Sequence, residues 1–164
     1  AYAGMILGYT RLQNTSTTSG HAIIAISSLA MNVLSTQSLN RLSINFKVPP
    51  SGNVEIECSF WMSAISDGAK FSLSTSTTYA ELDPIHTYDA DETVFIDETD
   101  HAVHTIRFAV TGLTPGTDTT YYLAAIASGG GVNIVHGTNR TSGTHYPPIT
   151  LKAIALPATI TAGS

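Results

Sequence analysis

Acidic side chains are concentrated in one stretch, Glu81 to Asp100, which holds eight of the chain's twelve carboxylates. Carboxylate oxygens are the ligands that calcium prefers, and one turn could bring several of them together. Asp89, Asp91 and Asp97 are therefore the candidate ligands of a calcium ion, the one cofactor that the sequence indicates. Against calcium, the stretch lacks the glycine and the terminal glutamate of a calcium-binding loop, and such runs more often form a solvated acidic rim.

Residues suited to catalysis are present, but not in the patterns that catalysis needs. His101 and His104 are three apart at the entry to a predicted strand, so their side chains should point to opposite faces and not share a metal. Glu55 and Glu57 share one strand face, as a glycosidase pair would, yet such pairs more often mark a rim or a polar subunit contact. No serine lies in a GxSxG elbow. We therefore predict that the protein is not an enzyme.

Aromatic residues with polar neighbours give a stronger signal, because a ring binds the apolar face of a sugar while its neighbours hydrogen-bond the hydroxyls. The predicted ligand-binding residues are Trp61, Tyr88, Asn139 and Tyr146. Tyr146 lies in a predicted loop, residues 137–148, where an exposed contact is expected. For Trp61 the alternative is burial against a neighbouring subunit.

Trp61 belongs to the most regular stretch of the chain, Leu42 to Ala64. Large apolar residues occupy its even positions on both sides of Pro49–Gly52, which is the two-residue period of strands with one buried face. Because prolines cannot continue a ladder, the stretch is predicted to form a long β-hairpin with its turn at these residues. A second layer must cover the even face, and Trp61 falls on the opposite, outer face.

The rest of the chain consists of short apolar runs separated by turn residues, and none of these runs has a clear helical pattern. Residues 27–41 are ambiguous between a loop and a weak strand. Further strands are predicted over residues 4–13, 21–26, from 71 onward, 94–96, 104–111, 121–127, 132–135 and 149–156. Some nine or ten short strands predict an all-β fold, an antiparallel two-sheet β-sandwich of the jelly-roll kind. The chain fits one such domain over residues 1–164, and its start at Ala1 also fits the C-terminal domain of a longer protein.

Charged residues make up 12% of the chain, against about 25% in ordinary soluble domains, while hydrophobic residues make up 43%. Such a surface is either covered by other subunits or kept in solution by its many hydroxyl groups. The net charge of −5 and the seven scattered basic residues argue against a nucleic-acid partner. Because no apolar run approaches the length of about 18 residues that a membrane span needs, membrane insertion is not expected.

Four segments are distributed along most of the chain's length: the opening GMILGYTRLQN, the central FKVPPSGNVEIECSFWM, and the later VTGLTPGTDTTYYLAAIASG and YPPITLKAIALP. In their order and their charge-poor, Ser/Thr-rich character they resemble the small sandwich domains of tailed-bacteriophage virion proteins, such as tail-fibre tips and head-decoration proteins. The resemblance implies an extracellular virion protein, a homotrimer whose distal loops contact a host surface glycan or protein. The residues themselves indicate assembly but no particular symmetry.

These observations lead to three alternative functions. The first is a non-enzymatic, homotrimeric tail-fibre or receptor-binding module, whose partners are its own copies, other virion proteins and the host surface. The second is a capsid decoration or head-fibre protein, with the same sandwich but no binding pocket in its loops. The third is a carbohydrate-binding module of an extracellular enzyme, which should be monomeric and bind soluble oligosaccharide through Trp61 or Tyr146.

Overall fold

The computed structural model describes residues 2–13, 22–36, 41–64, 68–80, 93–96, 101–139 and 143–161. Within these residues the chain forms strands and turns and no helix. The strands are β1 (Ile6–Leu12), β2 (Ala22–Ala25), β3 (Asn32–Val33), β4 (Ser43–Lys47), β5 (Val54–Ala64), β6 (Ala69–Ser74), β7 (Thr93–Ile96), β8 (His101–Val110), β9 (Asp118–Ala127), β10 (Val132–Asn139), β11 (Thr144–Tyr146) and β12 (Ile149–Ala155).

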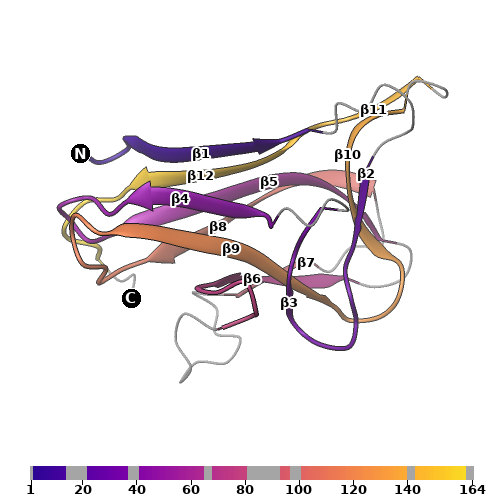
Figure 1. Ribbon diagram of the computed structural model, residues 1–164, viewed down its shortest axis with the longest axis horizontal. Coiled ribbons are helices and arrows are strands. Elements are labelled where there is room, and N and C mark those ends of the chain that lie inside the picture. Colours follow the sequence, from indigo (N-terminus) through magenta and orange to yellow (C-terminus); the bar gives the residue numbers. More distant parts are fainter. Residues whose placement is uncertain are drawn as a thin grey trace.

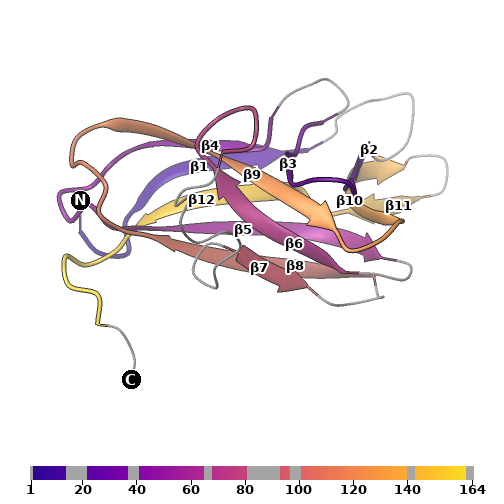
Figure 2. The same ribbon diagram turned by 90° about the horizontal axis from the view of Figure 1, so that it is seen from below.

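The strands form two antiparallel sheets that pack face to face (Figures 1 and 2). In the seven-stranded sheet, β5 pairs with β8 on one side and with β12 and β10 on the other. β1 extends this sheet beyond β12, while β2 and β11 extend it beyond β10. In the five-stranded sheet, β9 lies between β6 and the pair β3 and β4, and β7 follows β6. The predicted antiparallel two-sheet β-sandwich is confirmed, with β3 and β11 as two very short additional strands.

The predicted hairpin over residues 42–64 is wrong. β4 pairs with β9 in the five-stranded sheet, whereas β5 belongs to the seven-stranded sheet. The Pro49–Gly52 turn therefore carries the chain across the sandwich from one sheet to the other. Alternation predicts the buried face of each strand, but the buried faces of two opposed sheets both point to the core. The pattern therefore cannot distinguish a hairpin from a crossover.

The turn that makes this crossover is held against the loop between β8 and β9. The backbone N–H of Leu113 donates a hydrogen bond to the Gly52 carbonyl at 2.9 Å. Gly52 has a φ of +70°, and a Cβ atom there would lie 2.7 Å from the Leu113 carbonyl oxygen. Only glycine fits this combination of conformation and close approach.

One hydrophobic cluster fills the space between the sheets and includes residues from Ile24 to Ala153. The rings of Phe60 on β5 and Phe71 on β6 meet across it, with their centroids 4.9 Å apart. Cys58 lies in this core, as predicted, and burial raises the pKa of its thiol, so it is an unreactive core residue.

The partner of β5 changes at Phe60. β12 pairs with β5 over residues 54–59 and β10 pairs with it over residues 61–64. The seven-stranded sheet is therefore forked, and Trp61 is the first residue on the β10 side of the fork. Figure 1 shows the β10–β11 hairpin extending upward at the right-hand end of the molecule.

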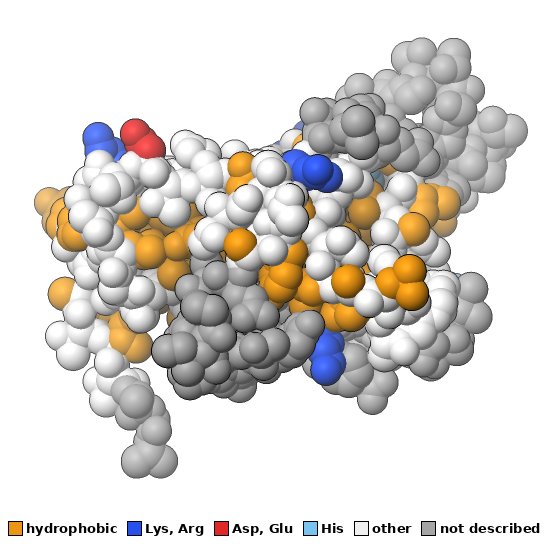
Figure 3. All heavy atoms as spheres, turned by 60° about the horizontal axis from the view of Figure 1, so that its bottom comes forward, with side chains coloured by type: hydrophobic (Ala, Val, Ile, Leu, Met, Phe, Trp, Pro, Cys, Tyr) orange, Lys and Arg blue, Asp and Glu red, His pale blue; other side chains and the backbone are white. Residues whose placement is uncertain are grey.

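The described part of the surface is poor in charge. Figure 3 shows few charged side chains on one face of the molecule, among many uncharged polar and some hydrophobic ones. None of the described segments forms a helix long and apolar enough to cross a membrane.

Candidate functional site

Three ring-bearing side chains meet on the outer face of the seven-stranded sheet, and we call them the aromatic cluster. They are Trp61 of β5, Tyr146 of β11 and His101 of β8. The ring centroids of Trp61 and Tyr146 are 4.6 Å apart with an interplanar angle of 59°, and those of Trp61 and His101 are 5.6 Å apart at 34°. Trp61 and Tyr146 are half-buried and His101 is exposed. The cluster is thus packed together while part of its surface is open to a ligand.

The strand registers explain why these residues meet. Trp61 lies opposite Val135 of β10, and Tyr146 lies opposite Gly137, two residues further along the same strand. Gly137 has no side chain and a φ of +92°, so nothing on β10 stands between the two rings at this position. His101 lies opposite Ser63, the next outward-facing residue of β5 after Trp61.

The structure brings together two of the four predicted ligand-binding residues. Trp61 and Tyr146 are 85 positions apart in the chain, yet their rings are in contact. Tyr146 was predicted in a loop, but it ends the short strand β11. Trp61 is covered in part by Tyr146 of its own chain, so its half-burial needs no neighbouring subunit.

The remaining predicted residues cannot be placed in this site. Tyr88 and the predicted calcium ligands Asp89, Asp91 and Asp97 lie outside the described residues. Asn139 ends β10, where its backbone pairs with Thr144. Within the described ranges, no group of three or more His, Cys, Asp or Glu side chains could hold a metal ion.

The two neighbouring histidines of β8 point to opposite faces, as the strand period predicts. His101 joins the aromatic cluster on the outer face. His104 turns toward the core side, where its ring centroid lies 6.4 Å from that of Phe60. The two imidazole rings therefore lie on opposite faces of the sheet.

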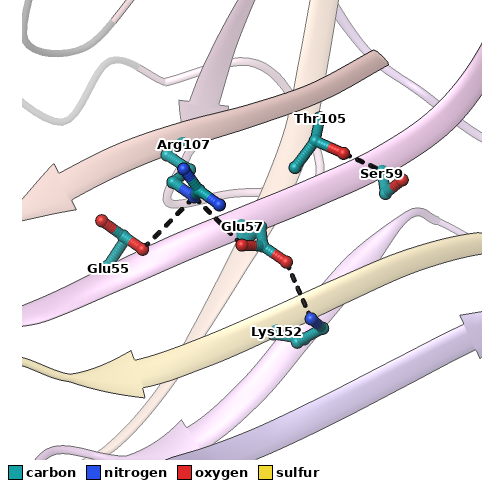
Figure 4. A network of polar contacts seen from close by, with 6 residues as sticks. All are labelled: Glu55, Glu57, Ser59, Thr105, Arg107 and Lys152. Carbon is teal, nitrogen blue, oxygen red and sulfur yellow. Dashed lines mark hydrogen bonds and ion pairs between the residues drawn. The ribbon is translucent and has the colours of Figure 1, made fainter. Parts of the chain in front are cut away.

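The carboxylate pair Glu55 and Glu57 is part of an ion-pair network on the same outer face (Figure 4). Nε of Arg107 lies 3.0 Å from Oε2 of Glu57 and 3.6 Å from Oε1 of Glu55. Nζ of Lys152 lies 2.8 Å from Oε1 of Glu57. The hydrogen bond from Lys152 is the main reason that the pKa of Glu57 falls below its ordinary value, although partial burial opposes it. A carboxylate held ionised in this way is a poor general acid, which argues against a glycosidase pair.

A row of hydroxyl groups lies between the aromatic cluster and this network. Ser59 of β5 has Thr105 of β8 on one side and Thr150 of β12 on the other. Oγ1 of Thr105 donates a hydrogen bond to Oγ of Ser59 at 3.2 Å (Figure 4). We call Ser59, Thr105 and Thr150 the hydroxyl row.

Sequence reasoning did not identify His101, Ser59, Thr105 or Lys152 as members of one face. The alternation within each strand shows which of them point outward. Their grouping depends on which strand pairs with which, and short strands joined by long loops do not reveal that pairing.

A separate hollow of about 270 Å³ lies between β2 and β3, at the side of the sandwich. Its lining includes Ile23, Asn32, Val33 and Ser35, and none of the lining residues is ionisable. It therefore offers neither the charged groups nor the aromatic rings that the outer face provides.

Comparison with known proteins adds little to this geometry. The chain matches no protein-family model, and it matches no curated protein. Among solved structures it is similar to the CBM22-1 xylan-binding domain of Xyn10C from Paenibacillus barcinonensis, with 9% sequence identity and a TM-score of 0.34. The alignment covers 94% of this chain and 97% of that chain. A likeness at this level transfers no function to the present protein.

Proposed function

We propose that this protein is a non-catalytic glycan-binding module whose aromatic cluster holds a sugar ring. The observation that carries the proposal is the contact between the rings of Trp61 and Tyr146, 4.6 Å apart on a half-open outer face. The sequence by itself predicts both residues as sugar-binding. The two rings come from separate strands, and the fold brings them into contact as a binding site requires.

The chemistry of the cluster suits a sugar ring. One face of a pyranose is lined with C–H groups and packs on an aromatic ring, while its edge carries hydroxyls that need donors and acceptors. Trp61 and Tyr146 supply rings at an angle of 59°, so that a bound ring can lie on one while touching the other. The tyrosine hydroxyl, the His101 imidazole and the adjacent hydroxyl row supply polar groups.

The biological setting is a separate matter from the binding chemistry. A homotrimeric tail-fibre tip that contacts a host surface glycan would use this face in the same way as a module attached to an enzyme. The virion setting rests on the segment resemblance alone. The proposed sugar site rests on the side chains, and it stands without a choice between the two settings.

The test uses the only tryptophan of the chain as its probe. A panel of immobilised glycans identifies binders, and soluble forms of these are titrated while Trp61 fluorescence is followed. Trp61→Ala and Tyr146→Ala, measured by calorimetry, should each lose about tenfold or more in affinity, because the stacking contact is removed. Trp61→Phe should keep part of the affinity.

Tyr2→Ala is the matched control, since Tyr2 is 88% exposed and its segment lies beside Ala155 at the C-terminal end of β12, whereas Tyr146 precedes the N-terminal end of that strand. It should bind as the wild type does. Unchanged thermal unfolding of each variant shows that the fold is kept. Failure of every glycan to bind, or full affinity in Trp61→Ala, would contradict the proposal.

A further inference from the structure

Resting on the proposed function, we propose that the ligand of this face is a neutral oligosaccharide of two or more sugars, lying along β5. The aromatic cluster holds one sugar. The hydroxyl row and the Glu57 ion-pair network bind the sugars that follow. The ligand class is thus a chain, and not a single terminal sugar.

The spacing along β5 suits such a ligand. Trp61, Ser59 and Glu57 are successive outward-facing residues of one strand, so they are about 7 Å apart and span about 14 Å in total. Each has outward-facing neighbours on the adjacent strands: Val103 for Trp61, Thr105 for Ser59 and Arg107 for Glu57. Polar groups therefore continue in one line from the aromatic cluster, over more than the width of one sugar.

The hydroxyl row supplies the middle position. Thr105 is exposed, while Ser59 and Thr150 are half-buried. A hydroxyl has one donor and two acceptor sites, so the single bond between Thr105 and Ser59 leaves capacity for a ligand. Hydroxyls of a sugar both donate and accept, and this row can meet either need.

The ion-pair network supplies the far position and indicates a neutral ligand. The Glu57 side chain is only 13% exposed between its two cations, whereas the Arg107 side chain is 60% exposed and that of Lys152 is 31% exposed. Arg107 has five N–H donors, of which Nε–H is directed at Glu57. The charges of Glu57, Arg107, Lys152 and Glu55 sum to zero. A fixed set of donors and acceptors without net charge suits the adjacent hydroxyls of a sugar better than a carboxylate or sulfate.

Arg11 of β1 lies to the side of the row of residues Trp61, Ser59 and Glu57 along β5. It is exposed and lies opposite Thr150, two strands away from β5. A ligand directed to Arg11 would cross the strands instead of following β5, and it would be anionic.

The experiment measures the affinity of the protein for fragments of one neutral glycan that the panel identifies, from the monosaccharide to the hexasaccharide. A second series of the same lengths carries uronate groups. In the wild type, affinity should rise by about tenfold or more from monosaccharide to trisaccharide, since each additional hydrogen bond adds roughly two- to tenfold. In Thr105→Val and Arg107→Gln this rise should shrink by about three- to tenfold, while the affinity for the monosaccharide stays the same. Thr120→Val is the matched control, because its hydroxyl accepts a comparable cross-strand bond from Asn45 on the other sheet.

The outcomes separate this inference from the proposed function. If no sugar of any length binds, both fail. If all lengths bind with equal affinity and the two variants behave as the wild type, the extended site is refuted while the single-sugar site stands. A preference for the uronate series would overturn the neutral ligand and point to Arg11.

Discussion

His136 is a buried histidine in β10. Its side chain belongs to a residue that is 3% exposed, and neither ring nitrogen has a hydrogen-bond partner among the described residues. Burial lowers its pKa below the ordinary value of 6.5, because the charged imidazolium would lose its hydration in the core. The folded protein therefore holds His136 in its neutral form.

This burial makes stability depend on pH. Below pH 6.5 the unfolded chain takes up a proton at His136 that the folded chain does not accept until its lowered pKa is reached. The free energy of unfolding should therefore fall as the pH drops from 6.5 to the lowered pKa of the folded chain, by up to about 1.4 kcal/mol per pH unit from this residue. Above pH 6.5 this contribution is constant.

Denaturant unfolding at pH 7.5 and pH 5.5 measures this effect. His136→Leu, which replaces the ring by an apolar side chain, should lose part of the pH dependence, whereas His145→Gln should keep it, because His145 is exposed on β11. An unchanged pH dependence in His136→Leu would show that this histidine is not the responsible group.

The candidate site could be predicted from the sequence only in part. Residue type pointed to Trp61 and Tyr146, because an exposed aromatic ring can pack against the apolar face of a sugar. Their contact could not be predicted, since it depends on β10 leaving β5 at Phe60 and on a three-residue strand, β11, that leaves no periodic pattern. The sequence places Glu57 beside Glu55 as a possible acid–base pair, but it does not reveal the two cations of Glu57, which lie 50 and 95 positions further along the chain.

At the scale of elements, β1 and β4 pass close to each other where the two sheets meet. Gly8 of β1 faces β4, and a Cβ atom there would overlap the Asn45 carbonyl oxygen and lie 3.3 Å from both Ile44 and Phe46. The obstacle is backbone, which cannot move aside as a flexible side chain can. The absence of a side chain at Gly8 is what lets the sheets close at this side of the core.

Gly8→Ala should therefore destabilise the protein by about 1–3 kcal/mol, through overpacking between β1 and β4. Gly130→Ala is the matched control, because a Cβ atom at Gly130 would meet nothing within 4 Å. It should leave the midpoint of denaturant unfolding nearly unchanged. Equal midpoints for the two variants would show that β1 can shift away from β4 without cost.

The strands themselves were largely predictable, while their partners were not. Period-two alternation marked β4, β5 and β8 because each has one face in the core and one face outside. The error at the Pro49–Gly52 turn arose because a crossover and a hairpin bury the same residues. The pairing of β4 with β9 and of β5 with β8 and β12, which are tertiary contacts, distinguishes the two.

At the scale of the whole molecule, the exposed hydrophobic side chains are concentrated beside one edge strand. Four of the eight large exposed ones among the described residues, Tyr2, Met5, Ile6 and Tyr9, lie on β1 or just before it. Among the strands that the structure describes, β1 pairs with β12 alone. An edge strand with exposed apolar side chains favours contact with another chain. The predicted assembly should therefore form at β1, and not at Trp61, which Tyr146 already covers in part.

Sedimentation equilibrium at micromolar concentration tests this prediction. The segment resemblance predicts a homotrimer, with three times the 17.3 kDa mass of one chain. Ile6→Lys should shift the mass toward the single chain, because a charge at this 55% exposed position opposes burial in an interface. Leu29→Lys is the matched control at a position that is 93% exposed and lies outside the strands, and it should keep the wild-type mass, as should Trp61→Ala. A wild-type protein that sediments as a single chain would mean that its hydroxyl-rich, charge-poor surface is soluble by itself, and that β1 is an exposed edge without a partner copy.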